Sequence, residues 1–246
     1  MTRRAMRKNG LTLPGLIAVA AASLTAAMGL SGCQTVASFS QPSLVRVIDA
    51  SYIAPAANVY VENTLIAGNI GEGYVSNYGT VSPSNAAQIK VTAATGGKTL
   101  VSSAVTLNAG AQHSVFLTDN GASPTQYTVT VLEDAQTPAA SGHSEFRFLN
   151  EAPRTGAVDV YMVPANTTLA NSIPLCTAVP VGSTCGYVSF ASQTVTMVIT
   201  PTGVTTTKYT STPLALTGGE VRTVVIIDSQ LTSNPPVNVV TANDVQ

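Results

Sequence analysis

Apolar and polar residues alternate in short runs along most of the chain. Such runs include 45–48 and 58–62 in the first half, and 146–149 and 159–163 in the second. Because successive side chains of a β-strand point to opposite faces, this two-residue period predicts strands with one face in a core. The predicted core residues are Val45, Val47, Val59, Val61, Phe146, Phe148, Val160 and Met162.

The alternating runs form two series in the same order. The segment 45–61 aligns without a gap with 146–162, at an offset of 101. The Gly-Tyr-Val-Ser sequence at 73–76 recurs at 186–189, at an offset of 113. Repetition of this kind indicates a duplicated domain. The growth of the offset predicts an insertion of twelve residues in the second copy.

Both copies have the composition of β-structure. The chain is rich in Val and Thr and poor in the helix formers Glu, Lys and Leu. Turn signals separate six or seven short strands in each copy of about a hundred residues, as in immunoglobulin-like sandwiches. We predict an all-β fold of two tandem immunoglobulin-like antiparallel β-sandwiches: copy one at 43–135, a linker at 136–143 and copy two at 144–246. Hairpin turns are expected at 108–110 and 217–219.

Residues 1–32 have the pattern of an export signal. Four basic residues lie within positions 3–8, and an Ala-rich apolar run extends from Leu11 to Leu30. These features are typical of a secretory signal. The run is long enough for an uncleaved transmembrane anchor, but Pro14 and several small polar residues weaken that alternative. The basic start also loosely resembles a twin-arginine signal, although we expect the general secretory route.

The sequence Leu-Ser-Gly-Cys at 30–33 resembles the lipobox of bacterial lipoproteins. This resemblance implies that residues 1–32 are a lipoprotein signal peptide and that the Cys33 thiol is lipidated, with acyl chains such as palmitate. Two or more chains hold a protein stably on a membrane. Residues 33–42 are then a tether to copy one. Gln34 stands where Asp would imply retention in the inner membrane, so the expected location is the cell envelope, at the outer membrane.

Low charge excludes several kinds of partner. Without residues 1–32 the chain keeps seven basic and twelve acidic residues, a net charge of −5. Such a protein offers no basic surface for nucleic acid and no polybasic cluster for anionic lipid. The lipid at Cys33 is therefore the expected link to the membrane.

Cys176 and Cys185 are the two remaining cysteines. Two thiols at this short spacing in an oxidising compartment indicate a disulfide. A metal site is the alternative, but His113 and His143 are the only histidines and neither has a neighbour at ligand spacing. We predict a disulfide that pins an enlarged loop of copy two, with no metal and no cofactor.

Residues 46–61 resemble the opening of a bacterial family of unknown function, DUF4397. The family pattern is R-V-x-[HN]-A-S-P-D-A-P-x-V-D-V-Y, and copy two keeps parts of it at 147–161. Copy one departs from it, with Tyr52 and Ile53 in place of Pro-Asp. The resemblance extends over both copies and implies a secreted or surface-anchored β-sandwich. It brings no catalytic residues with it.

Arg46 and Arg147 recur on the first strand of each copy. One interpretation makes them grips for an anion or a carboxylate ligand. The interpretation we favour places each arginine on the outer strand face, paired with an acid such as Glu62 or Glu72.

Tyr60 and Tyr161 also recur, and each ring is a conceivable platform for a sugar. A tyrosine at a strand end more often buries its ring and hydrogen-bonds its hydroxyl. The chain also has no Trp. We therefore expect both residues to determine the fold.

Candidates for catalysis are weak. The segment 182–186 has Thr at the nucleophile position of a Gly-x-Ser-x-Gly elbow. His113 is expected at an exposed strand position and His143 in the linker, so neither is expected to act as a general base. The glycine-rich stretch 68–73 precedes no helix that would bind phosphate, and 119–121 is expected to be a turn.

These observations favour a non-enzymatic, lipid-anchored envelope protein with a structural or interaction role and no catalytic residues. The alternative is a surface module that binds a glycan, a peptide or an envelope protein through sheet edges or through the Cys176–Cys185 loop. A hydrolase is the third class.

Overall fold

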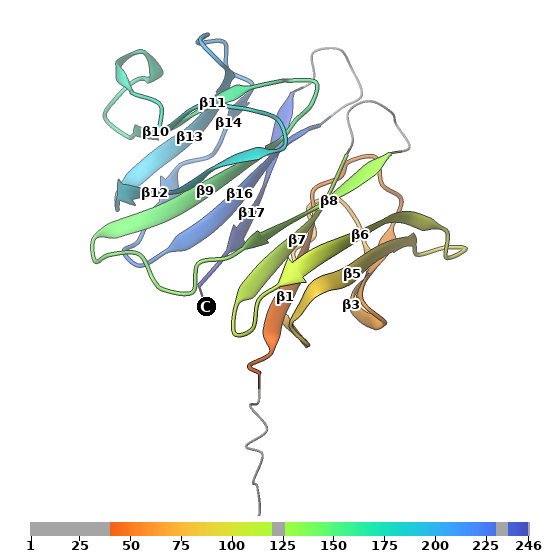
Figure 1. Cartoon of the computed structure of the whole chain (residues 1–246). Coiled ribbons are helices and arrows are strands. Elements are labelled where there is room, and N and C mark those ends of the chain that lie inside the picture. The colour runs from red at the N-terminus through yellow and green to blue at the C-terminus, as the bar shows by residue number, and fades with distance from the viewer. Residues whose placement is uncertain (1–39, 120–125, 230–235, 246) are drawn as a thin grey trace, which may run out of the picture. The chain divides into compact units, whose positions relative to one another are not determined.

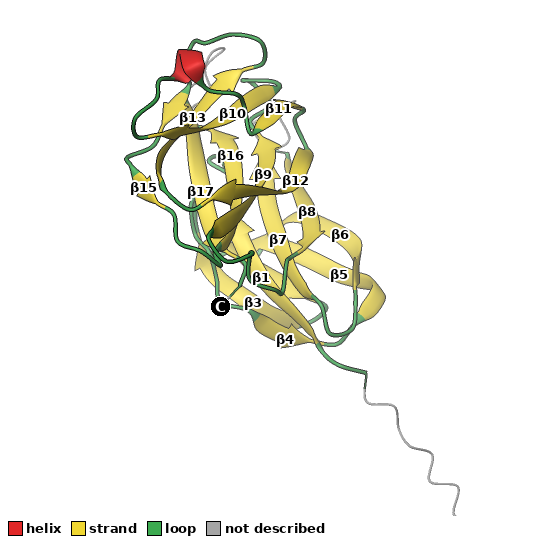
Figure 2. Cartoon of the chain, turned by 90° about the vertical axis from the view of Figure 1, so that its left-hand side faces the viewer, coloured by secondary structure: helices red, strands yellow, loops and turns green. Residues whose placement is uncertain are grey.

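The computed structural model describes residues 40–119, 126–229 and 236–245, within a compact unit at 39–246. The predicted signal peptide and Cys33 lie outside the described residues. In the described ranges, no helix is long and apolar enough to cross a membrane. The helical structure there is the single turn η1 (Leu169–Asn171), seen in red in Figure 2.

Copy one forms two four-stranded sheets, from β1 to β8 (Figure 1). Its strands are β1 (Ser43–Asp49), β2 (Ala57–Val61), β3 (Thr64–Ile70), β4 (Gly79–Val81), β5 (Ser84–Ala93), β6 (Thr99–Leu107), β7 (Gln112–Asp119) and β8 (Tyr127–Glu133). The order β4-β1-β7-β8 makes what we call the inner sheet of copy one. The order β3-β2-β5-β6 makes its outer sheet.

Copy two repeats this arrangement. Its strands are β9 (His143–Glu151), β10 (Val158–Pro164), β11 (Cys176–Val179), β12 (Ser183–Ala191), β13 (Thr194–Pro201), β14 (Tyr209–Thr210), β15 (Leu214–Ala215), β16 (Val221–Asp228) and β17 (Val237–Asn243). Its inner sheet has the order β12-β9-β16-β17. Its outer sheet has the order β11-β10-β13-β14, and β15 also pairs with β13.

The predicted all-β fold of tandem β-sandwiches is confirmed, with one unexpected pairing in each copy. β1 runs parallel to β7, and β9 runs parallel to β16. The sequence had predicted antiparallel sheets. Parallel neighbours need a long connection, and in each copy the intervening strands supply it. The first strand of each copy consequently lies in the middle of its inner sheet.

Alternation correctly predicted the cores of the two sandwiches. All eight predicted residues are buried in the apolar cluster between the two sheets of their own copy. Full burial of an aliphatic or aromatic side chain of this size contributes about 1.5–3 kcal/mol. These residues therefore carry much of the stability of each sandwich.

The inner sheets are buried on both faces, which alternation alone did not predict. A third cluster of buried apolar side chains draws on the inner sheets of both copies. Its members are Ile48, Ala50, Phe116, Leu149, Val225, Ile227, Val240 and Ala242. The unbroken apolar run at 224–227 is the sequence signal for this arrangement, because a strand covered on both faces loses its alternation. The two copies therefore pack together through their inner sheets.

The prediction of hairpin turns at 108–110 and 217–219 is wrong. β6 pairs with β5 in the outer sheet, whereas β7 pairs with β1 and β8 in the inner sheet. Each turn thus carries the chain from one sheet of a sandwich to the other. Gly110 and Gly219 have φ values of 72° and 92°, a conformation that glycine adopts without a clash at Cβ.

Strand pairing also corrects the register of the duplication. Val45 on β1 lies opposite Gly79 on β4, and the equivalent Phe146 on β9 lies opposite Val188 on β12. The offset from Gly79 to Val188 is 109 and not the predicted 113, so the two Gly-Tyr-Val-Ser sequences do not occupy equivalent positions. Up to this point copy two therefore has eight additional residues, not twelve.

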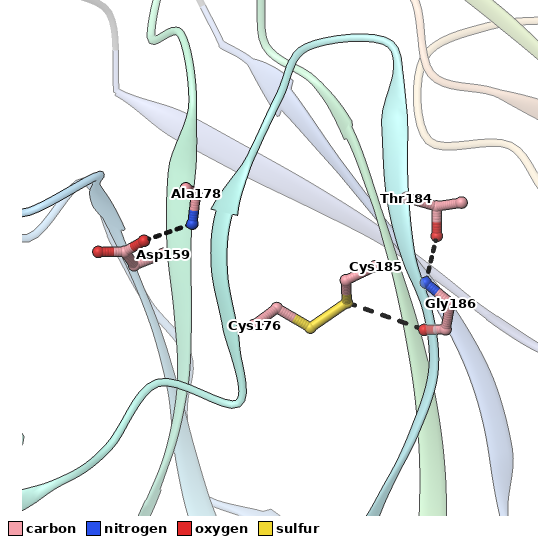
Figure 3. Close-up of a disulfide and its surroundings, with 6 residues drawn as sticks. All are labelled: Asp159, Cys176, Ala178, Thr184, Cys185 and Gly186. Carbon is pink, nitrogen blue, oxygen red and sulfur yellow. Dashed lines mark hydrogen bonds between the residues drawn. A yellow bond between two sulfur atoms is a disulfide. The ribbon is translucent and has the colours of Figure 1, made fainter.

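The predicted disulfide between Cys176 and Cys185 is present, and it joins the two sheets of copy two (Figure 3). Cys176 lies on β11 at the edge of the outer sheet, and Cys185 lies on β12 at the edge of the inner sheet. The Asp159 side chain holds β11 in place by accepting a hydrogen bond from Ala178 N at 2.7 Å. The disulfide therefore ties two sheet edges together, whereas the sequence had predicted that it pins an enlarged loop.

Replacing both Cys176 and Cys185 with Ser is expected to lower the free energy of unfolding by about 2.5–3 kcal/mol, because the closed loop no longer restricts the unfolded chain. Urea unfolding measures the change. The wild-type protein in a reducing agent is the control, and it should match the double variant. Equal stability of the oxidised, reduced and substituted proteins would contradict this account.

Candidate functional site

Arg46 on β1 and Arg147 on β9 are buried where the copies meet. Their residues are only 2% and 3% exposed. Strand alternation does place them on the face opposite the sandwich core, but the other copy covers that face. The prediction of an exposed arginine paired with Glu62 or Glu72 is therefore wrong, because the real partners are two aspartates.

Arg46 binds the C-terminal end of copy two. Its Nη2 pairs with the carboxylate of Asp244, and its Nη1 donates to the carbonyl oxygen of Asn243. Nε donates to Ser114 Oγ on β7 at 2.7 Å. Asp134 Oδ2 lies 3.6 Å from Nη2. All three guanidinium nitrogens thus have acceptors.

Arg147 makes the reciprocal contacts with the end of copy one. Its Nη2 donates to Asp134 Oδ1 and its Nη1 to the carbonyl oxygen of Glu133, at 2.5 and 2.7 Å. Nε and Nη2 both donate to Thr223 Oγ1, at 3.1 and 2.7 Å. Each arginine therefore binds the aspartate of the other copy, as in a two-fold contact between identical subunits.

A tyrosine ring covers each guanidinium. The Cζ atom of Arg46 lies 4.9 Å from the ring centroid of Tyr78, and that of Arg147 lies 4.8 Å from the ring of Tyr187. Each hydroxyl donates to the aspartate of its own copy at 2.7 Å. Burial, with the neighbouring carboxylate adding to it, raises the pKa of both hydroxyls above its usual range. Both tyrosines therefore stay neutral donors.

We call this group the interdomain network. Its members are Arg46, Tyr78, Ser114, Asp134, Arg147, Tyr187, Thr223 and Asp244. Two guanidinium groups face two carboxylates, so the charges balance, and every charged group is bonded inside the network. Every guanidinium nitrogen of this buried set already has an acceptor from the protein. Its geometry fits a structural role for the two arginines and not a carboxylate grip.

Sequence reasoning missed Asp134 and Asp244. Each residue directly follows the last strand of its copy, and each carboxylate accepts a hydrogen bond from a hydroxyl of its own inner sheet, Ser114 or Thr223, at 2.7 Å. The two aspartates thus occupy equivalent places in the duplication. The strand register shows this equivalence, because Glu133 lies opposite His113 on β7 and Asn243 lies opposite Arg222 on β16.

Two further aspartates, Asp119 and Asp228, fix the turns that follow β1 and β9. Tyr52 N donates to Asp119 Oδ2 at 3.1 Å, and Arg154 N donates to Asp228 Oδ2 at 2.7 Å. Asp119 is itself the last residue of β7. The rest of the turn expected at 119–121 lies outside the described residues.

Glu151 and Asp49 are buried carboxyl groups at the ends of the equivalent strands β9 and β1. Thr130 Oγ1 of copy one lies 3.5 Å from Glu151 Oε1. Burial is the main cause that raises the pKa of Glu151 to about 7, and the charge of Asp119 adds to it. Burial likewise raises the pKa of Asp49 to about 6. Ionisation of either group therefore disfavours the folded arrangement.

The surroundings of the two histidines fit structural roles. His113 is buried, at 2% exposure, so the prediction of an exposed position is wrong. The reason is that His113 shares the core-facing side of β7 with Val115. Its Nε2 accepts a hydrogen bond from Asn108 N at 3.3 Å, and burial lowers its pKa. His143 opens β9 and is exposed.

The other sequence candidates are parts of strands and turns. The segment 182–186 is a turn and the start of β12, and 68–73 is the end of β3 with the turn after it. Tyr60 is half-buried and Tyr161 is buried. Within the described ranges, no three His, Cys, Asp or Glu side chains are grouped in a way that could hold a metal ion.

Residues 43–161 match the model of a family described as "Domain of unknown function (DUF4397)". The resemblance seen at 46–61 and 147–161 is thus confirmed, and the matched span covers copy one, the linker and the first two strands of copy two. No curated protein matches the chain.

One similar solved structure is a family CBM26 carbohydrate-binding module from Eubacterium rectale in complex with maltoheptaose. It has 11% sequence identity and a TM-score of 0.25, and the match covers 80% of this chain and 95% of that chain. A likeness at this level carries no argument about function.

Replacing Arg147 with Met is expected to lower the free energy of unfolding by about 3–5 kcal/mol, because the buried Asp134 loses its charged partner from the other copy. Urea unfolding of the full chain measures the loss. The control is Arg222→Met, which removes a partly exposed pair with Glu220 and should cost less than about 1 kcal/mol. A cost for Arg147→Met as small as that of the control would refute a central role for the network.

The contribution of Glu151 to stability is expected to fall as the pH rises from 5 to 8. Glu151 has a pKa of about 7 when folded, against an ordinary value of 4.5, so the folded state binds the proton more tightly. Below about pH 4.5 the carboxyl group is neutral in both states and has no effect. As the pH rises from one pKa value to the other, the unfolded state is favoured more and more, and the free energy of unfolding falls by up to about 1–3 kcal/mol.

Unfolding of Glu151→Gln at pH 5, 6.5 and 8 measures this contribution. The variant should lose less stability with rising pH than the wild type, and Asp49 accounts for part of what remains. Glu145→Gln, a partly exposed position on the same strand, is the control. If Glu151→Gln and Glu145→Gln had the same pH dependence, Glu151 would not be the responsible group.

Proposed function

We propose that the protein is a non-enzymatic, lipid-anchored protein of the bacterial cell envelope with a structural or interaction role. The observation that carries the proposal is the interdomain network together with the apolar cluster of the inner sheets. Together they join both copies into one unit, and the described residues present no group of side chains suited to catalysis. The match to DUF4397 is compatible with this role, although the family is described only as a domain of unknown function.

The contact between the copies is suited to a rigid body. Domains joined by a small polar contact generally move relative to one another, whereas a large apolar contact suppresses that motion. Here eight buried apolar side chains form a cluster beside the charged network, on the same inner sheets. A fixed unit of this kind holds its two outer sheets at a constant separation, which suits a spacer or a platform in the envelope.

The proposed anchor is Cys33. The sequence around it supports lipidation, since an apolar run and the residues Leu-Ser-Gly stand directly before it. Ser43, the first residue of β1, is the tenth position after Cys33. A chain of that length spans at most about 36 Å. The sandwiches would therefore stay close to the membrane surface, and Gln34 favours the outer membrane.

Replacing Cys33 with Ser is expected to abolish incorporation of alkyne palmitate and to release the protein from the membrane fraction. Metabolic labelling followed by membrane fractionation measures both effects. The control is the double Ser variant of Cys176 and Cys185, which lacks the other two cysteines and should keep its label and its membrane location. Unchanged labelling and fractionation of Cys33→Ser would refute the anchor.

A further inference from the structure

The outer sheets of the two copies differ at one equivalent place. Tyr60 on β2 lies opposite Lys90 on β5, and in copy two Tyr161 on β10 lies opposite Val198 on β13. Both copies thus have a tyrosine at this position. The residue opposite the tyrosine is a cation in copy one and an aliphatic residue in copy two.

The position two residues after each tyrosine also differs. In copy one it is Glu62, whose backbone N donates to Gln88 O. In copy two it is Val163, which lies opposite Thr196. The equivalent places are therefore charged in one copy and apolar in the other.

In copy two the chain itself covers this place. Leu169 of η1 packs against Tyr161, Val163 and Val198, and each of these three is less than about a tenth exposed. Leu169 lies between β10 and β11, where copy two has a longer connection than copy one. A polypeptide segment is thus an occupant that this place in the fold accepts.

In copy one the same place is an open groove of about 300 Å³. Its lining residues are Tyr60, Glu62, Asn63, Lys90, Thr92 and Gly97. Only two residues, Glu62 and Asn63, connect β2 to β3, so this connection is too short to fold over the sheet as the Leu169 segment does.

The charged side chains that line the groove are placed to bind a partner. Lys90 is exposed, and it takes part in no ion pair found among the described residues. Glu62 also lines the groove, and its Oε1 accepts a hydrogen bond from Gln88 N at 2.9 Å. Tyr60, a third lining residue, is half-buried and so has an accessible part.

We propose that this groove binds an extended peptide segment of another polypeptide through a carboxylate of that segment. The carboxylate pairs with Lys90, a neighbouring side chain lies on the ring of Tyr60, and Glu62 accepts hydrogen bonds from the peptide. A peptide is favoured over a sugar because a peptide segment already fills the equivalent place in copy two. The proposal is independent of the anchor at Cys33.

Selection from a random hexapeptide library on the immobilised full chain tests the proposal. Peptides selected on the wild type should be enriched in Asp and Glu, and those selected on Lys90→Glu should be enriched in Lys and Arg. The best acidic peptide should bind Lys90→Glu at least about tenfold more weakly, because an attraction becomes a repulsion. Fluorescence anisotropy with the labelled peptide measures the affinities.

The matched control is Lys98→Glu, the same charge change at an exposed position outside the groove. It should leave the affinity within about twofold, whereas Tyr60→Ala should weaken binding. Lys90 and Lys98 are both exposed, so unfolding curves of the two variants should overlay that of the wild type. No enrichment, or equal weakening by Lys90→Glu and Lys98→Glu, would overturn the proposal. So would capture of glycans from an oligosaccharide array with no peptide bound, and none of these results would affect the lipid anchor.

Discussion

The exchange of arginine and aspartate between the copies is the constraint on which the rest of the structure depends. Arg46 and Arg147 each carry a charge out of water, and each meets the carboxylate of the other copy. A buried ion pair of this kind adds little net stability, because desolvation offsets most of the attraction. The apolar cluster of the inner sheets, whose eight members include Ile48 and Ala242, is the main favourable contribution to joining the copies. The network instead fixes the register, since a shifted arrangement would leave a buried charge without its partner.

The role of the network in fixing the register explains how the two copies diverged. Positions of the network keep their chemistry, as Ser114 and Thr223 show, since both place a hydroxyl between an arginine and an aspartate. The outer sheets carry no such constraint. There Lys90 and Val198 occupy equivalent positions with opposite character. The inner faces are committed to each other, so the outer faces and edges are where the described strands can diverge in what they bind.

Much of the fold could be predicted from the sequence, whereas most of the site could not. Alternation identified core residues such as Val47 and Phe148, because each sandwich has a core of its own. The same rule assumes that the second face of a strand meets water, and for this reason Arg46 was placed on the surface. Residue identity also misled the alignment at Tyr187, whose equivalent is Tyr78, since register follows hydrogen bonds and not matching letters. The partners Asp134 and Asp244 lie beyond the last strands, where no periodic pattern marks them.

The pseudo-symmetry of the contact fails at the ends of the first strands, and this failure bears on how firmly the copies are held. Ala50 belongs to the apolar cluster, but its equivalent in copy two is Glu151, a buried acid. One position earlier, copy one has Asp49 and copy two has Asn150. The amide of Asn150 bonds to backbone groups on both its nitrogen and its oxygen. At these two positions each copy thus has one carboxyl group with a raised pKa, and the other copy has an alanine or an amide there, which is neutral at every pH. Protonation of either acid favours the folded state, and of the two it is Glu151 that lies against the other copy, where its Oε1 meets Thr130 Oγ1 at 3.5 Å.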